Sequence, residues 1–251
     1  MLFTEHAFVD RIAAAAEAGF EAVECQFPDP FASAGAVRTA LRTAGLRMVS
    51  LNASPGDAAR GELGLGVVAG AEDRFARSMD EAIDYALAVD CPVIHCMSGN
   101  AAADEAEGAV RSRLVANLRG AADACAARGL TVVIEPMNRI DRPAYWLQHP
   151  DQAAGVIAEV GRPNLGMLFD AYHVGKNGLD VLCLLDRHGP VIRHMQIAGV
   201  PHRHEPDDPA WVAALFGRID AGGYGGWVGC EYNPRGATGA GLGWLSPYRP
   251  L

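Results

Sequence analysis

The sequence predicts an α/β fold in which a parallel sheet closes into a (β/α)8 barrel. Three observations support this prediction. Helical and strand patterns alternate along all 251 residues, and the strands are short apolar runs typical of strands buried on both faces. Polar residues stand at the strand ends throughout the chain: Glu24, Asn52, His95, Glu135, Asp170, Gln196 and Glu231. An open sheet gathers its site at one switch point, whereas a barrel brings every strand end to one mouth. We therefore expect one barrel domain spanning 1–251.

The elements follow in a regular order. Apolar residues at helical spacing predict a first helix between Thr4, its expected N-cap, and Gly19. The next helices are predicted over 36–44, 72–89, 105–128, 150–160, 180–188 and 209–221, and the strands over 20–25, 46–51, 92–96, 130–134, 165–169, 191–195 and 227–230. Seven strands are visible, and a helix stands where a barrel needs its first strand. We therefore expect the first strand to be lacking or altered, with a disturbed barrel or a substitute strand at that place.

Two long connections follow strand ends. The segment 52–71 contains five glycines, and 137–149 contains the aromatic pair Tyr145 and Trp146. In a barrel of this kind, loops after the strands surround the mouth. We expect these two loops to form its roof.

Composition excludes several classes of function. The formal net charge is −9, and Lys176 is the single lysine, so a nucleic-acid partner is not expected. Apolar stretches are strand-sized and the first residues lack a signal peptide, which predicts a cytoplasmic protein without membrane spans. The six cysteines form no CxxC pair and are expected to be reduced and structural. The oligomeric state is left open, and a homo-oligomer is compatible with the sequence.

Four polar residues at consecutive strand ends form the strongest functional pattern. Glu135, Asp170, Gln196 and Glu231 are 26 to 35 residues apart, about one strand-helix unit each. Burying unpartnered carboxylates is costly, so their convergence implies a cation, a proton or chemistry. Their oxygen atoms suit a hard divalent ion such as Mg²⁺ or Mn²⁺ and leave coordination positions for a small substrate. The pattern therefore predicts a catalytic metal site.

Each of these residues alone has a simpler interpretation. Glu135 or Glu231 could cap a helix or pair with an arginine, and Asp170 could be the N-cap of the following turn. Gln196 alone is more often a buried, hydrogen-bonded amide than a ligand. Their shared register at four strand ends favours the site.

Several sequence blocks carry a resemblance to a known family. The blocks are Gly19 to Glu24, Ile134 to Asn138, Phe169 to His173, His194 to Ala198, Arg203 to Pro206, Gly229 to Tyr232 and Ala240 to Trp244. Together and in this order, they resemble the hydroxypyruvate isomerase family of xylose-isomerase-like TIM barrels, over nearly the whole chain.

The resemblance implies a metal site of Glu135, Asp170, Gln196 and Glu231, with Glu135 and Glu231 also catalytic. One glutamate would remove the proton next to the substrate carbonyl, and a proton would return to the neighbouring carbon of the enediolate. The implied substrate is a small hydroxy-oxo acid, with hydroxypyruvate and 2-hydroxy-3-oxopropanoate as the pair. His173 and Arg203 resemble substrate contacts, and Arg203 could bind a substrate carboxylate. His95 is a further candidate contact, although a histidine in an apolar run can also be structural.

Alternative functions remain on the same fold. A sugar or oxo-acid isomerase or epimerase, such as a 2-oxo-tetronate isomerase, is one of them. Gln196 argues mildly against a ketose 3-epimerase, because that group generally has histidine at this ligand. The altered start of the barrel, and a loop after Pro206 without the family's glycine-rich stretch, also allow a degenerate, non-catalytic barrel.

Overall fold

The structure is a computed structural model that describes residues 1–27 and 32–248, and in it seven parallel strands line a barrel. In chain order they are β1 (Ala22–Cys25), β2 (Arg47–Asn52), β3 (Val93–His95), β4 (Thr131–Ile134), β5 (Leu165–Asp170), β6 (Ile192–Ile197) and β7 (Val228–Cys230). Each strand pairs with the next one in sequence, in the order β1 to β7. This architecture confirms the predicted parallel α/β barrel.

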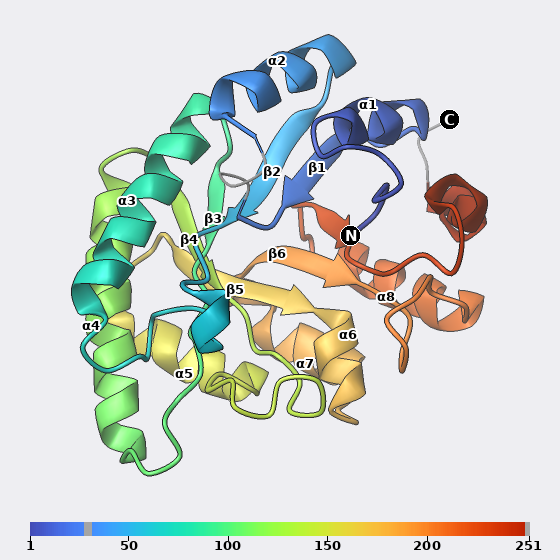
Figure 1. The fold of residues 1–251 in the computed structure, drawn as a ribbon. Helices are drawn as coiled ribbons and strands as arrows, with labels where there is room; N and C mark the ends of the chain where they lie inside the picture. Colours follow the sequence, from blue (N-terminus) through green and yellow to red (C-terminus); the bar gives the residue numbers. More distant parts are fainter. Residues whose placement is uncertain (28–31, 249–251) are drawn as a thin grey trace.

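Helices surround the strands, as Figure 1 shows. They are α1 (Asp10–Glu17), α2 (Ala34–Ala44), α3 (Glu72–Ala88), α4 (Glu107–Ala126), α5 (Pro150–Val160), α6 (Ala171–Lys176), α7 (Val181–His188) and α8 (Pro209–Ala221). Three 3-10 segments, η1 (Ala58–Arg60), η2 (Gly189–Val191) and η3 (Thr238–Tyr248), complete the described elements. No described helix is both long and apolar enough to cross a membrane.

Burial explains why these sequences form these strands. All six residues of β5 are buried, and Val132, Val133 and Ile134 of β4 have no exposed surface. Strands covered by helices on one side and filled by side chains on the other need apolar residues at nearly every position. The predicted continuous apolar runs are therefore a direct consequence of the barrel. All six cysteines are free, as expected, and Cys183 is the exposed one.

The first helix differs from its prediction. It begins at Asp10 rather than after Thr4, and its N-cap position, Val9, makes no side-chain capping bond. Residues 2–5 instead form turns, and the Phe3 amide donates to the Thr238 hydroxyl near the other end of the chain. Thr4 is therefore not an N-cap, because tertiary contacts of this segment outweigh the local capping signal.

The barrel is open between β7 and β1. Within the described residues no ladder joins these two strands, which bears out the expectation that the first strand is lacking or altered. Residues 1–4 lie beside this opening and, with β1 and β7, line a cavity of about 430 Å³. The N-terminus lies near the end of β1 in Figure 1.

The two long loops both contact the loop that follows β3 at the carboxyl end of that strand. Gly64 forms an isolated bridge with Ser98, and Asn100 forms another with Tyr145. The Tyr145 hydroxyl also accepts a hydrogen bond from the Ser98 amide over 2.8 Å. Segments 52–71 and 137–149 are thus tied to the loop after β3, as expected for parts of a roof.

Candidate active site

The four predicted strand-end residues occupy four consecutive strands. Glu135 directly follows β4, Asp170 ends β5, Gln196 lies in β6, and Glu231 directly follows β7. Asp170 is paired in register with Gln196 on the next strand. The side chains of Glu135, Asp170 and Gln196 are buried, and that of Glu231 is 16% exposed. Parallel strands therefore bring these groups to the same end of the barrel.

Asp170 has two separate contacts. Its Oδ1 accepts a hydrogen bond from the Tyr172 amide over 2.8 Å, so Asp170 is the N-cap of α6. The alternative interpretation of this residue as an N-cap is therefore confirmed. Its Oδ2 instead lies 3.3 Å from Arg203 Nη2 and 3.7 Å from His173 Nε2. Capping one oxygen fixes the orientation of the carboxylate, and the second oxygen remains directed at the site.

Arg203 stands between two of the carboxylates. Its Nη2 donates to Glu231 Oε2 over 2.7 Å as well as to Asp170 Oδ2. Its guanidinium also lies over the Tyr172 ring, 5.0 Å from the ring centre. The backbone of Arg203 has a φ of 57°, a left-handed conformation that is unfavourable for a residue with a side chain but is held by bonds to Gly199 and Asn233. The arginine is therefore fixed beside the acidic cluster.

Burial makes full ionisation of this cluster unfavourable. Desolvation raises the pKa of Glu135 well above its usual range, and the nearby charges of Glu231 and Asp170 add to the effect. Desolvation also raises the pKa of Asp170 to about 7, although Arg203 opposes the shift, and it raises the pKa of Glu231. Three mutually repelling carboxyl groups with one arginine need a proton or another cation to be stable together.

Several buried polar atoms support a cation rather than protons alone. Within the described residues, Glu135 Oε1 and Gln196 Oε1 have no hydrogen-bond partner and no contact with solvent. Each unpaired buried acceptor costs about 1–3 kcal/mol. These two oxygens come from the strands on either side of β5, which ends in Asp170, and they match the ligand preference of Mg²⁺ or Mn²⁺. The residues present therefore fit a hard divalent ion.

A compact group of ligand atoms includes a histidine as well. One atom each from Glu135, Asp170 and His173 lie within 4.8 Å of one another. The hydrogen bonds of His173 argue against direct ligation, because its Nδ1 accepts from the Asn138 amide over 3.0 Å. In a neutral ring the other nitrogen, Nε2, then carries the proton and cannot bind a metal in this form. Burial lowers the pKa of His173 to about 3, so the ring is neutral.

His95 is also a neutral, buried ring. Its Nε2 lies 3.6 Å from Glu135 Oε2, beyond hydrogen-bond distance, and has no partner among the described residues. Burial lowers the pKa of His95 to about 3. His95, His173 and Arg203, the three predicted substrate contacts, thus all lie at the edge of the acidic cluster.

The contacts of Glu24 with His194 and Gln196 were not predicted from the sequence. Glu24 Oε1 accepts from Gln196 Nε2 over 3.0 Å, and Glu24 Oε2 forms a short bond with His194 Nε2. Burial alone would raise the pKa of Glu24, but the interactions with His194 and Gln196 lower it overall. The sequence identified Glu24 only as a polar strand-end residue, and it gave His194 no role. The spacing of His194 and Gln196, two residues apart on one strand, is the signal that they share a face.

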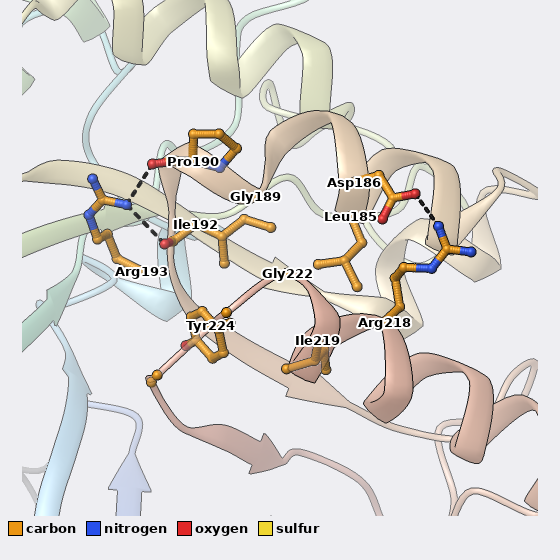
Figure 2. A pocket seen from close by; sticks show the side chains of 13 residues that line it. Leu185, Asp186, Gly189, Pro190, Ile192, Arg193, Arg218, Ile219, Gly222 and Tyr224 are labelled. Carbon is orange, nitrogen blue, oxygen red and sulfur yellow. Dashed lines mark hydrogen bonds and ion pairs between the residues drawn. The ribbon is translucent and has the colours of Figure 1, made fainter.

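A second cavity lies away from this cluster. It has a volume of about 610 Å³ and is lined by the ends of α7 and α8 and the start of β6, as Figure 2 shows. Its charged groups are already paired: Arg218 with Asp186, and Arg193 with the carbonyls of Pro190 and Ile192. It adjoins the amino ends of the strands, whereas the sites of such barrels lie at the carboxyl ends. The acidic cluster is therefore the candidate active site.

Comparison with known proteins agrees with this architecture. The family described as "Xylose isomerase-like TIM barrel" matches residues 12–248. The chain belongs to this family. The resemblance inferred from the sequence blocks is thus confirmed at the level of the whole chain.

The curated relatives of this chain include isomerases. A 2-oxo-tetronate isomerase of Cupriavidus necator is 46% identical over 249 residues, covering 99% of this chain and 95% of the relative. A hydroxypyruvate isomerase of Escherichia coli is 36% identical over 250 residues, covering 99% and 96%. A crystal structure described as AP endonuclease, family 2, from Brucella melitensis superposes with a TM-score of 0.94 at 40% identity, covering 99% and 96%.

Proposed function

We propose that this protein is a metal-dependent isomerase of the aldose–ketose type that moves the carbonyl of a small hydroxy-oxo acid by one carbon. Hydroxypyruvate and 2-hydroxy-3-oxopropanoate are the first proposed pair. The observation that carries the proposal is the buried cluster of Glu135, Asp170 and Glu231 around Arg203, at the carboxyl ends of a family barrel. The similarity to full-length isomerases supports the same reaction class.

The metal would be held by Glu135, Asp170, Gln196 and Glu231. All four offer oxygen, and Gln196 Oε1 and Glu135 Oε1 are buried without a partner among the described residues. A bound Mg²⁺ or Mn²⁺ supplies positive charge that stabilises the oxyanion formed when the proton next to a carbonyl leaves. His173 is assigned a different part, because its protonated Nε2 can donate to a substrate oxygen.

Glu135 and Glu231 are the proposed proton-transfer groups. Each follows a different strand, β4 and β7, so they approach the substrate from two sides. In the metal-free protein, burial raises the pKa of both carboxyl groups, so each accepts a proton more readily than an exposed glutamate. One removes the proton from the carbon beside the carbonyl, and an enediolate forms. A proton then returns to the neighbouring carbon, the hydroxyl proton passes from its oxygen to the former carbonyl oxygen, and the carbonyl has moved by one position.

Arg203 is the proposed anchor for the substrate carboxylate. It is the arginine already bound to the acidic cluster, and its planar guanidinium matches a carboxylate through two parallel hydrogen bonds. Its backbone bonds to Gly199 and Asn233 and the underlying Tyr172 ring hold it in place. A substrate carboxylate held there would set the position of the adjacent carbons.

A second candidate substrate is a 2-oxo-tetronate. The relative with this name shares 46% identity with nearly the whole chain. Like hydroxypyruvate, a 2-oxo-tetronate has a carboxylate next to its carbonyl, so the same arginine and glutamates would serve both. The two substrates differ by one hydroxymethylene unit, and contacts that accept or exclude it decide between them.

Exchange of solvent deuterium into the substrate tests this function. The Mn²⁺-loaded protein is incubated in heavy water with hydroxypyruvate and with 2-oxo-tetronate, and NMR follows label at the carbon beside the carbonyl. We expect label with at least one substrate, and loss of labelling after chelation or in Glu135→Gln. Glu81→Gln, on the exposed surface of α3, is the matched control. Absence of label from both substrates in metal-loaded protein would contradict the proposal.

A further inference from the structure

Glu24 connects two side chains on the far side of the barrel opening. It lies on β1, and its carboxylate reaches His194 and Gln196 on β6. The pairing of β1 with β2 changes register between Val23 and Glu24. The pairing of β5 with β6 also changes register, at the residue directly before His194. Such irregularities re-aim side chains next to functional sites. The contact therefore lies at a specialised place in the sheet.

The bond from Gln196 has a fixed direction. An ionised carboxylate only accepts hydrogen bonds, so Gln196 must present its Nε2 to Glu24 Oε1, 3.0 Å away. The reverse orientation of the amide would place Oε1 against the carboxylate and leave the NH2 group in its place. Gln196 Oε1 consequently points away from Glu24, and it is buried without a partner in the described part of the chain.

A glycine on β7 makes room for this contact. A Cβ atom on Gly229 would lie 2.6 Å from the carboxyl carbon of Glu24 and closer still to its Oε1. Such distances are far below van der Waals contact, so any side chain at 229 would displace the carboxylate. Gly229 has no positive φ, so backbone conformation is not what calls for glycine at this position. A glycine at 229 instead leaves room for the Glu24 carboxylate.

We propose that Glu24 is a positioning residue that holds the Gln196 amide with its oxygen facing the Glu135 and Asp170 carboxylates. His194 holds the other oxygen of Glu24 and so keeps the carboxylate in place. The proposal rests on the proposed function, in which Gln196 is a metal ligand. Because the amide has one oxygen and one nitrogen, only one of its two orientations can bind a cation, and Glu24 selects it.

Mn²⁺ affinity of the chelator-treated protein, measured by calorimetry without substrate, tests this assignment. Glu24→Asp keeps the charge but shortens the side chain, and we expect Mn²⁺ to bind about 10- to 100-fold more weakly, as for other partners of metal ligands. Glu24→Gln should weaken binding similarly, because an amide permits both orientations of Gln196. Glu21→Gln, exposed at the start of the same segment, is the matched control and should bind like wild type.

Gly229→Ala tests the same contact without changing a charged residue. We expect it to displace the Glu24 carboxylate and weaken Mn²⁺ binding to the same degree as Glu24→Asp. The double variant Glu24→Gln with Gln196→Glu should regain affinity. In it the amide at position 24 donates to the carboxylate at position 196, and that carboxylate offers an oxygen to the metal in either orientation. Melting temperatures of the metal-free variants report whether each one is folded.

The outcomes separate this assignment from the proposed function. If wild type does not bind Mn²⁺, both are overturned. If wild type binds Mn²⁺ and both Glu24→Asp and Gly229→Ala bind it equally well, the positioning role alone is overturned. Weaker binding in Glu24→Gln alone would show that Glu24 acts through its negative charge and not by orienting Gln196. Weaker binding in all three variants with recovery in the double variant supports the assignment.

Discussion

The two sides of the barrel differ in strand pairing and in burial. Strands β4, β5 and β6 each pair with a neighbour on both sides, and every residue of β5 is buried. β1 pairs only with β2 within the described residues, and all four of its residues are half-buried. Three of the four proposed ligands belong to the fully paired side, and the fourth follows β7 at the opening. The site therefore depends mainly on the fully paired strands, and the two strands at the opening contribute Glu231 after β7 and Glu24 on β1.

The largest expected effect is on the complete side. Glu135→Gln removes a proposed base and ligand together, and we expect kcat for isomerisation to fall about 10³-fold. Because the buried carboxyl group has a raised pKa and its Oε1 has no hydrogen-bond partner, its removal should leave the metal-free protein as stable as wild type or more so. Steady-state kinetics and thermal melts check the two parts. Retention of full activity would remove Glu135 from the mechanism.

Arg203→Lys tests the proposed substrate anchor. The ammonium keeps the charge but cannot form two parallel bonds to a carboxylate, so we expect KM to rise by about 10- to 100-fold. The rise should be smaller for a substrate analogue in which the carboxylate is replaced by an amide. Equal effects on the acid and the amide would show that Arg203 does not bind the substrate carboxylate.

The same truncation on each side compares their packing directly. Val133 on β4 has no exposed surface, whereas Val23 on β1 is half-buried. We expect Val133→Ala to lower the free energy of unfolding by roughly 2 kcal/mol and Val23→Ala by less than about 1 kcal/mol. Urea denaturation measures both. Similar losses would mean that the open side is packed as tightly as the closed one.

The pH dependence of stability has a defined sign for Asp170. Its folded pKa, raised by burial to about 7, lies above the unfolded value of 3.8, so its favourable contribution is lost as pH rises toward and through 7. Asp170→Asn lacks this titration. The melting temperature of the metal-free variant, relative to that of metal-free wild type, should therefore rise between pH 5 and 8. His95 and His173 titrate in the opposite sense, but they are present in both proteins. If the melting temperatures of the two proteins changed equally with pH, this would contradict the raised pKa of Asp170.

Most of the fold followed from local patterns. Each of the seven predicted strands is present, because a strand buried on both faces must be apolar, and this leaves a clear signal. Thr4 failed as a helix cap because the Phe3 amide is tied to Thr238, a contact that local sequence does not encode. The short helix α6 was missed because it directly follows Asp170, with no separating turn.

The site was predictable at the level of strand ends but not of contacts. The positions of Glu135, Asp170, Gln196 and Glu231 followed from their place after apolar runs. The bonds of Glu24 to His194 and Gln196 span 170 and 172 residues, and they depend on space at Gly229 and on two register shifts. Such contacts are properties of the folded barrel, so single-residue patterns could mark Glu24 as a candidate but not assign its partners.

We propose that the oxygens of four consecutive strand ends form one divalent metal site. A crystal structure of the Mn²⁺-loaded protein, with data collected at the manganese absorption edge, tests it most directly. We expect one anomalous peak about 2.1 Å from oxygens of Glu135, Asp170, Gln196 and Glu231, with His173 Nε2 outside the coordination sphere. A peak bound by His173 in place of Gln196, or no peak in the barrel mouth, would contradict it.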